Sequence, residues 1–437
     1  MTVFPVLFVL LSARAQCAQD IPHVSRGMLK PEYWIKRAQY PDRVYMSKWA
    51  VMRINKFVRQ EGYQIDPFEE SPWVEGRRIR GYIEEKHEEL RSWKKYDSDG
   101  NKLKDKGFEK SMRRLTRPDR VPDRVRVRYG MTIRRTQVRM LPTGAPLQRQ
   151  PHDPDFDILV QTQVEAGTPV AIYHPSADGR WFFVLTSQCT GWVRKADLCW
   201  SDSPKAFRKF EEAERYLVVT GREAGVYRDR ELGNPACGVA MGGWIPLLGE
   251  EPGRFIVLMP DAGSRGEVEF YSGYVSKRED VREGYPDMTD RNVLIQCFKW
   301  LGATYRWGHV GRTTDCSGFI LSVLRTFGYQ LQRSSDLEIR SFGLLAMPTD
   351  PGRKEVRLAN LVPFRTLLGF DGHIGLYLGQ VGERHYIIHA CNGYWKRSGG
   401  RDREVIIRSV IVSDLSLGEN GKNGSLMERL VSAAIID

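Results

Sequence analysis

Cys316 is the residue whose surroundings point most clearly to chemistry. It lies in YRWGHVGRTTDCSGFILSVLRTFG, residues 305–328. Asp315 is a good N-cap residue, so the segment predicts a helix that Cys316 opens and that stops at Gly328. The helix would have one apolar face, formed by Phe319, Ile320, Val323, Leu324 and Phe327. The partial positive charge at a helix N-terminus favours the thiolate that a cysteine nucleophile needs. Taken alone, the segment fits a buried structural cysteine equally well.

Two histidines further along the chain could serve such a nucleophile. The segments GHIGLYLG (372–379) and YIIHACNG (386–393) have the pattern of two strands. His389 follows His373 by 16 residues, a separation that a β-hairpin closes. A nucleophilic thiol needs a base, and the base needs a group that orients it. A helix-opening cysteine followed by histidines on adjacent strands therefore favours a catalytic site.

The order D-C-S-G-F, G-H-I-G-L-Y-L-G and I-H-A resembles that of the NlpC/P60 family of cell-wall cysteine peptidases. The resemblance implies a papain-like α+β domain, in which a helix carrying the cysteine packs on an antiparallel sheet carrying the histidines. It implies that Cys316 is the nucleophile, His373 the general base and His389 the residue that orients His373. No metal or other cofactor is expected.

The resemblance also implies residues around the oxyanion and the substrate. Tyr305 matches a tyrosine near the oxyanion site, and the backbone N–H of Cys316 is the other natural donor. The small residues Ser317 and Gly318 would leave room for a substrate. The predicted oxyanion and substrate-binding residues are Tyr305, Trp307, Asp315, Ser317, Arg333, Ser334 and Asp336.

The sequence departs from the family pattern at two places. His309 stands where the family has the second glycine of Y-x-W-G-G, and we expect it either to alter the cleft or, more simply, to point outward. Some relatives that bind a free amine place an acidic residue directly after the arginine that corresponds to Arg333. Here Ser334 and Ser335 follow, and Asp336 is the candidate replacement for the missing charge.

The whole chain is predicted to be a multidomain α+β protein. The segment GTPVAIYHPSADGRWFFVLTSQCTGWV resembles a bacterial SH3 domain, and a second β-rich module follows it. Helices are expected at 45–58, with Trp49, Met52, Ile54 and Phe57 as apolar positions, and at 76–93. The charged stretch 94–123 is expected to be an exposed arm or linker. The predicted domains are a signal peptide (1–19), an N-terminal helical module with linker (20–124), two SH3-like β-barrels (125–200 and 206–278) and the papain-like NlpC/P60 domain (289–437).

Composition limits the partners and the compartment. The 437 residues include 66 Lys and Arg against 54 Asp and Glu, a net charge of +12. This charge suits an anionic wall polymer, with solubility alone as the alternative, and no basic stripe with interleaved aromatics favours nucleic acid. Seven scattered cysteines show no zinc spacing. The apolar run from Val3 to Leu11, followed by Ala13 and Ala15, predicts export to the periplasm or cell envelope, and no segment has the length of a membrane span.

The domain order resembles that of γ-D-glutamyl-L-diamino acid endopeptidases, in which an SH3 module can close one end of the cleft and favour substrates with a free N-terminal L-Ala. We therefore expect hydrolysis of the γ-D-glutamyl-L-diamino acid bond in wall peptides. An N-acetylmuramoyl-L-alanine amidase, or a peptidyl or acyl transferase on the same core, is the alternative. Proteins of other classes remain open: a non-catalytic wall-binding protein, or an SH3-type scaffold for Pro-rich peptides.

Overall fold

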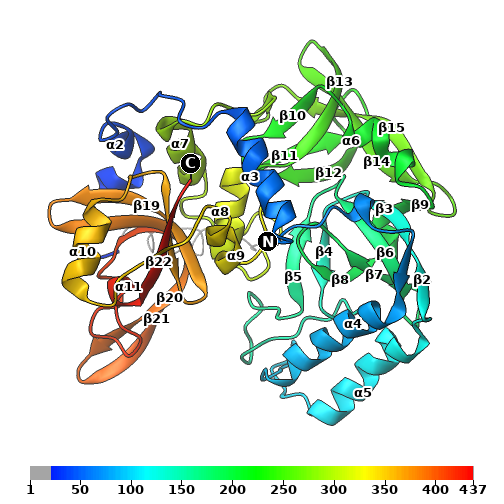
Figure 1. The fold of residues 1–437 in the computed structure, drawn as a ribbon, viewed down its shortest axis with the longest axis horizontal. Helices are drawn as coiled ribbons and strands as arrows, with labels where there is room; N and C mark the ends of the chain where they lie inside the picture. The colour runs from blue at the N-terminus through cyan, green and yellow to red at the C-terminus, as the bar shows by residue number, and fades with distance from the viewer. Residues whose placement is uncertain (1–20, 437) are drawn as a thin grey trace, which may run out of the picture. The chain divides into compact units, whose positions relative to one another are not determined.

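A computed structural model describes residues 21–436 of the chain (Figure 1). Its contacts divide into two compact units. The first unit comprises the described residues of Met1–Val58 together with Pro286–Arg306 and Arg312–Asp437. The second unit comprises Arg59–Tyr285 and the short segment Trp307–Gly311. The stretch predicted as an N-terminal helical module is thus divided between the units after Val58.

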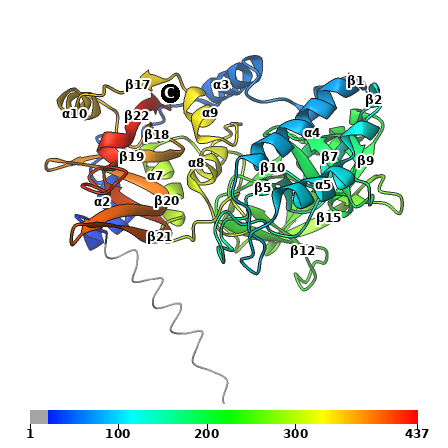
Figure 2. The ribbon, with the colours of Figure 1, turned by 90° about the horizontal axis from the view of Figure 1, so that it is seen from below.

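The first unit is built on a six-stranded sheet with the order β17-β22-β18-β19-β20-β21. Its strands are β17 (Leu345–Ala346), β18 (Thr366–Phe370), β19 (His373–Val381), β20 (Arg384–Ser398), β21 (Arg401–Asp414) and β22 (Leu430–Ile435). Its helices are α2 (Pro31–Ile35), α3 (Lys48–Gln60, which runs two residues past the unit's end), α7 (Asp290–Lys299), α8 (Cys316–Arg325), α9 (Ser335–Arg340), α10 (Pro351–Ala359) and α11 (Leu426–Arg429). Helix α8 packs on β19 and β20, beside which it lies in both views (Figures 1 and 2).

Burial explains the character of α8 and of the strands beneath it. Every residue of α8 from Cys316 to Leu324 is buried, so the helix is enclosed on all sides and not only along the one predicted apolar face. Strand β18 is also buried throughout, because its sheet is covered on both faces. The predicted helix at Cys316 and both predicted histidine strands are confirmed. Strands β19 and β20 form the predicted antiparallel hairpin, with Leu376 opposite Ile388.

The second unit contains two seven-stranded sheets. The first has the order β5-β4-β8-β7-β6-β3-β9 and the second β12-β11-β15-β14-β13-β10-β16. The first consists of β3 (Arg128–Thr132), β4 (Thr136–Arg139), β5 (Val160–Val164), β6 (Pro169–Pro175), β7 (Trp181–Leu185), β8 (Thr190–Arg194) and β9 (Leu198–Ser201). The second consists of β10 (Tyr216–Val219), β11 (Glu223–Tyr227), β12 (Pro235–Ala240), β13 (Trp244–Glu251), β14 (Arg254–Ala262), β15 (Val268–Ser276) and β16 (Val281–Glu283). Within residues 21–436 no ladder pairs the two edge strands of either sheet, so closed barrels are not seen.

Helix α4 (Gly76–Arg91) packs on the first of these sheets, α5 (Asp105–Thr116) packs beside α4, and the short α6 (Arg208–Glu211) contacts β14 of the second sheet. Strands β1 (Trp73–Glu75) and β2 (Arg124–Arg126) form a separate two-stranded sheet. Ile79 and Ile83 of α4 share one hydrophobic core with Phe183 and Trp192 of the first sheet. The second sheet has its own core, which includes Val226 and Val257.

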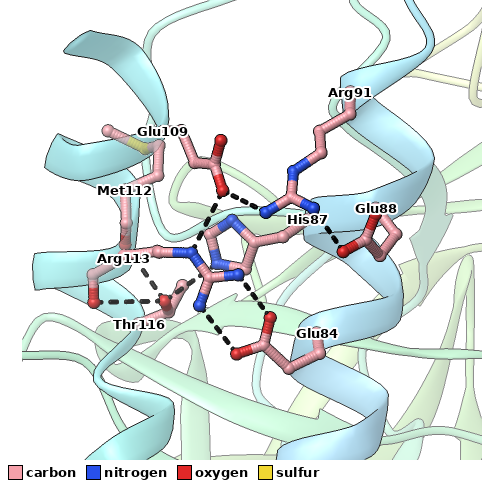
Figure 3. Close-up of polar contacts among 8 residues, drawn as sticks. All are labelled: Glu84, His87, Glu88, Arg91, Glu109, Met112, Arg113 and Thr116. Atoms are coloured by element: carbon pink, nitrogen blue, oxygen red, sulfur yellow. Dashed lines mark hydrogen bonds and ion pairs between the residues drawn. The ribbon is translucent and has the colours of Figure 1, made fainter. Parts of the chain in front are cut away.

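The prediction of an exposed arm at 94–123 is wrong, because this stretch contains α5 packed beside α4. Phe108 and Met112 pack against a core cluster that includes Leu90 of α4. Arg113 reaches across to Glu84, with N–O distances of 2.7 and 2.6 Å, and also binds Glu109 (Figure 3). Arg113 and Glu109 thus form part of an ion-pair cluster between the two helices, and the few apolar residues of α5 at helical spacing face inward.

The helix predicted at 45–58 is present as α3, but it buries a different face. Trp49, Met52 and Phe57 are 76%, 58% and 43% exposed, whereas the buried residues are Val51, Asn55 and Val58. Asn55 is the reason, since its side-chain amide donates to the Gly328 carbonyl at 2.9 Å and accepts from the Gln330 N–H at 2.8 Å. These bonds satisfy two backbone groups and turn the polar side of the helix inward.

Two further predictions concern the N-terminus and the membrane. The predicted signal peptide, residues 1–19, and Cys17 lie outside the described residues. Across residues 21–436, no helix combines the length and the apolar character needed to cross a membrane. The six cysteines in this part of the chain are free thiols.

Candidate active site

Cys316 is the first residue of α8, as the sequence predicts. Asp315 is the N-cap in extended conformation, and its Oδ1 accepts from the Gly318 N–H at 2.8 Å. The Cys316 side chain is buried, and its Sγ lies 3.9 Å from the carbonyl oxygen of Gly372, the residue before His373. The helix thus places the thiol at the start of the strand that carries the predicted base.

His373 and His389 are in direct contact. Nε2 of His373 lies 2.8 Å from Nδ1 of His389, and the two rings meet edge to face with centroids 5.0 Å apart. Gly375 makes this approach possible, because a Cβ added there would lie 2.8 Å from the Cβ of His389. Since Nε2 of His373 is engaged with His389, Nδ1 is the nitrogen left to receive a proton from the thiol.

Ser413 extends this pair and was not found from the sequence. Its Oγ lies 3.0 Å from Nε2 of His389, and the residue is fully buried. Ser413 belongs to β21, where it pairs with Ile387 while His389 pairs with Ile411. It is therefore a diagonal cross-strand neighbour of His389, a relation that only the strand register reveals.

Burial sets the protonation of the thiol and the base. It raises the pKa of Cys316 to about 12, with the carboxylate of Asp315 adding to the rise and Arg333 opposing it. Enclosure by protein lowers the pKa of His373 to about 4. Desolvation of the buried thiol therefore outweighs the effect of the helix N-terminus, which we expected to favour the thiolate. At neutral pH the resting pair is a thiol and an uncharged imidazole.

A buried ion pair between Arg333 and Asp315 lies next to Cys316 in the chain. Arg333 Nη2 lies 2.5 Å from Asp315 Oδ2, and both side chains are buried. Ser317 Oγ donates to the Arg333 carbonyl at 3.0 Å, and Arg333 Nη1 donates back to this hydroxyl. Tyr305 is buried and pairs through its backbone with Thr314, the residue before Asp315. Burial, with Cys316 and Asp315 adding to it, raises the pKa of Tyr305 well above the usual value. The structure thus brings four of the predicted oxyanion and substrate-binding residues together around Cys316.

Other predicted residues have different surroundings. Ser334 caps α9 by accepting from the Leu337 N–H at 3.2 Å. Asp336 is largely exposed and pairs with Arg340, one turn further along α9. Trp307 belongs to the segment that groups with the second unit, where its ring stacks on Phe156 with centroids 5.5 Å apart.

His309 belongs to the same short segment as Trp307. It is buried, so the expectation that it points outward is wrong. Its φ of 55° lies in the left-handed region that favours glycine. This backbone conformation accounts for a glycine at the corresponding place in the family pattern.

Glu338 is a second residue that the sequence did not single out. It lies on α9 and is fully buried, and in the described part of the chain neither carboxylate oxygen has a hydrogen-bond partner. Desolvation raises its pKa well above the usual value, against the opposing charge of Arg333. The only sequence signal for Glu338 is the helical period, because position 338 lies one turn after the Ser334 cap. Burial therefore favours the protonated, neutral form of Glu338.

Replacing Glu338 by Gln is expected to remove a pH-dependent loss of stability. Because the folded-state pKa of Glu338 is raised, its contribution to stability is complete below the unfolded pKa near 4.5 and is lost as the pH rises toward the folded-state pKa. The variant should match the wild type at pH 4 and exceed it by at least about 1 kcal/mol at pH 7. Denaturant unfolding at both pH values measures this. The exposed neighbour variant Asp336→Asn is the control, and an unchanged pH profile in Glu338→Gln would contradict the assignment.

No group of three or more His, Cys, Asp or Glu side chains among the described residues is arranged to hold a metal ion. The candidate nucleophile and base are the thiol of Cys316 and the imidazole of His373, and His389 and Ser413 lie behind the base.

Comparisons with known proteins identify two domains of this chain. The NlpC/P60 family model matches residues 302–397, and the model of an SH3 domain of the SH3b1 type matches residues 146–194. A γ-D-glutamyl-L-lysine dipeptidyl-peptidase of Bacillus subtilis (strain 168) is 24% identical over 235 residues, which are 51% of this chain and 71% of that protein.

A similar overall fold is found in a solved structure. An NlpC/P60 endopeptidase from Photobacterium damselae subsp. piscicida superposes with a TM-score of 0.76 at 17% identity, covering 93% of this chain and 96% of that one. An NlpC/P60 family protein from Bacillus cereus ATCC 10987 gives a TM-score of 0.45 at 19% identity, covering 63% and 81%. The first likeness extends over nearly the whole fold. This chain therefore carries an NlpC/P60 domain and an SH3 domain of the SH3b1 type, as the resemblance in its sequence predicted.

Proposed function

We propose that this chain is a cysteine peptidase that hydrolyses cell-wall peptides at the γ-D-glutamyl-L-diamino acid bond. The observation that carries the proposal is the 2.8 Å contact between His373 and His389 beside a thiol at the N-terminus of α8. A purely structural cysteine requires neither histidine. The name of the Bacillus subtilis relative supports the choice of bond.

The proposed reaction begins with a neutral thiol and a neutral imidazole. As Cys316 Sγ bonds to the γ-carbonyl carbon, the thiol proton passes to Nδ1 of His373. The backbone N–H of Cys316 and the hydroxyl of Tyr305 are the proposed donors to the oxyanion. His373 then gives its proton to the departing amine of the diamino acid, leaving a thioester. Water attacks the thioester and returns a proton through His373, which releases the glutamyl carboxyl group and the free thiol.

The surrounding residues have supporting roles in this proposal. Asp315 caps α8 and is bound to Arg333, which also bonds Ser317, so the three residues hold the loop before α9 against the nucleophile. Ser334 and Asp336 stay predictions as contacts to a substrate amine. Trp307 likewise stays a predicted substrate contact.

The arrangement of modules is part of the same proposal. We assign SH3-like modules to 125–200 and 206–278 and the catalytic domain to 289–437, with export to the periplasm or cell envelope. The net charge of +12 favours retention on anionic wall polymers.

Mass spectrometry of muropeptide digests tests the bond. We expect L-Ala-γ-D-Glu-diaminopimelate to be cut between glutamate and the diamino acid. Cleavage between muramic acid and L-Ala would replace this activity with an amidase, and new amides formed with an added amine would indicate a transferase. Binding of wall material without any cleavage would contradict the enzyme proposal. Equal cleavage of free and muramyl-linked stems would remove the requirement for a free N-terminal L-Ala.

A further inference from the structure

We propose that Ser413 is a positioning residue that holds His389 in the one tautomer that lets His373 act as a base. This inference rests on the proposed function. It is based on a continuous row of contacts, with 2.8 Å from His373 Nε2 to His389 Nδ1 and 3.0 Å from His389 Nε2 to Ser413 Oγ. Since each neutral imidazole carries one N–H, the direction of one hydrogen bond in this row determines the direction of the next.

Only one of the two directions is productive. If His373 is to accept the thiol proton at Nδ1, its own proton must be on Nε2 and point to Nδ1 of His389. His389 then carries its proton on Nε2 and must donate it to Ser413 Oγ. In the reverse direction Ser413 donates to His389, His389 donates to His373, and His373 already has a proton on Nδ1. In that arrangement the thiol has no base.

The surroundings of His389 make the role of Ser413 necessary. His389 is 1% exposed and Ser413 is fully buried, so water cannot easily replace the hydroxyl. The pKa of His389 lies well below its usual value, because of burial and the neighbouring His373, which keeps His389 at a single proton. Without an acceptor at Ser413, the productive tautomer leaves a buried N–H unsatisfied, whereas the reverse tautomer leaves only an unpaired nitrogen lone pair. The balance then shifts toward the unproductive form.

The Ser413→Ala variant should therefore lose about 10- to 100-fold in kcat with little change in KM, because Ser413 is buried in the sheet and makes no proposed substrate contact. Ser413→Thr and Ser413→Cys keep an oxygen or a sulfur at this position and should recover part of the loss. Ser409→Ala, four residues earlier on the same strand, is the control and should behave as the wild type.

The tautomer itself can be read without substrate by nitrogen-15 NMR of the full chain labelled at histidine. We expect the proton of His389 on Nε2 in the wild type and a shift toward Nδ1 in Ser413→Ala. A wild-type His389 protonated on Nδ1, or a Ser413→Ala variant with unchanged kcat, would overturn the inference. Because the NMR result needs no peptidase activity, it separates failure of this inference from failure of the proposed function.

Discussion

Replacing Cys316 by Ala is expected to lower the rate of wall-peptide hydrolysis by at least about 10⁴-fold, because it removes the sulfur proposed to form the thioester. The fold should persist, since the N-cap bond from the Gly318 N–H to Asp315 does not involve the thiol. The measurement is product release from the γ-D-glutamyl tripeptide, followed by mass spectrometry.

The matched control for this variant is Cys297→Ala. Cys297 is another fully buried thiol of the first unit, on α7, and burial also raises its pKa. Its loss should affect stability and leave turnover nearly unchanged. Activity that survives in Cys316→Ala but disappears in Cys297→Ala would show that Cys316 is not the nucleophile.

Replacing His373 by Ala is expected to reduce turnover by about 10²- to 10⁴-fold, the usual contribution of a general base. His389→Ala should cost less, about 10- to 100-fold, because His389 acts only through its hydrogen bond to His373. Adding His373→Ala to Cys316→Ala should cost nothing further, since the two residues perform one step together.

The pH profile gives an independent check on His373. Burial lowers its pKa to about 4, so the base is unprotonated and competent above this value. Activity should therefore persist to mildly acidic pH and fall only as the pH approaches 4, where His373 takes up a proton. An acid limb centred at the ordinary histidine value near 6.5 would contradict the enclosed base.

Local sequence patterns carried enough information to predict the helix and the hairpin that hold the candidate residues. The helix at Cys316 follows from an N-cap and an apolar run, and the hairpin of His373 and His389 follows from two short strands near each other in the chain. Both features depend on neighbours within a few turns or one hairpin. The domain resemblance added their order and roles.

The features that the sequence did not predict depend on tertiary contacts, which local sequence patterns do not encode. Ser413 lies 24 residues after His389 in the chain and reaches it through the pairing of β20 with β21. No sequence motif marks Ser413. The raised pKa of Cys316 comes from tertiary burial, which the local argument from the helix dipole could not include. The segment 94–123 is part of the fold because Phe108 and Met112 of α5 pack against a core that includes Leu90, and its high charge hides this short apolar face.

The central claim is that Cys316 gives its proton to His373, and iodoacetamide labelling tests it most directly. Alkylation rates at pH 7, mapped to individual cysteines by mass spectrometry, should be compared between the wild type and His373→Ala. We predict that Cys316 reacts faster in the wild type than in the variant, whereas the partly exposed Cys189 and Cys237 react equally in both. Equal rates at Cys316 in the two proteins, or a wild-type Cys316 no more reactive than the buried Cys297 and Cys391, would contradict the account.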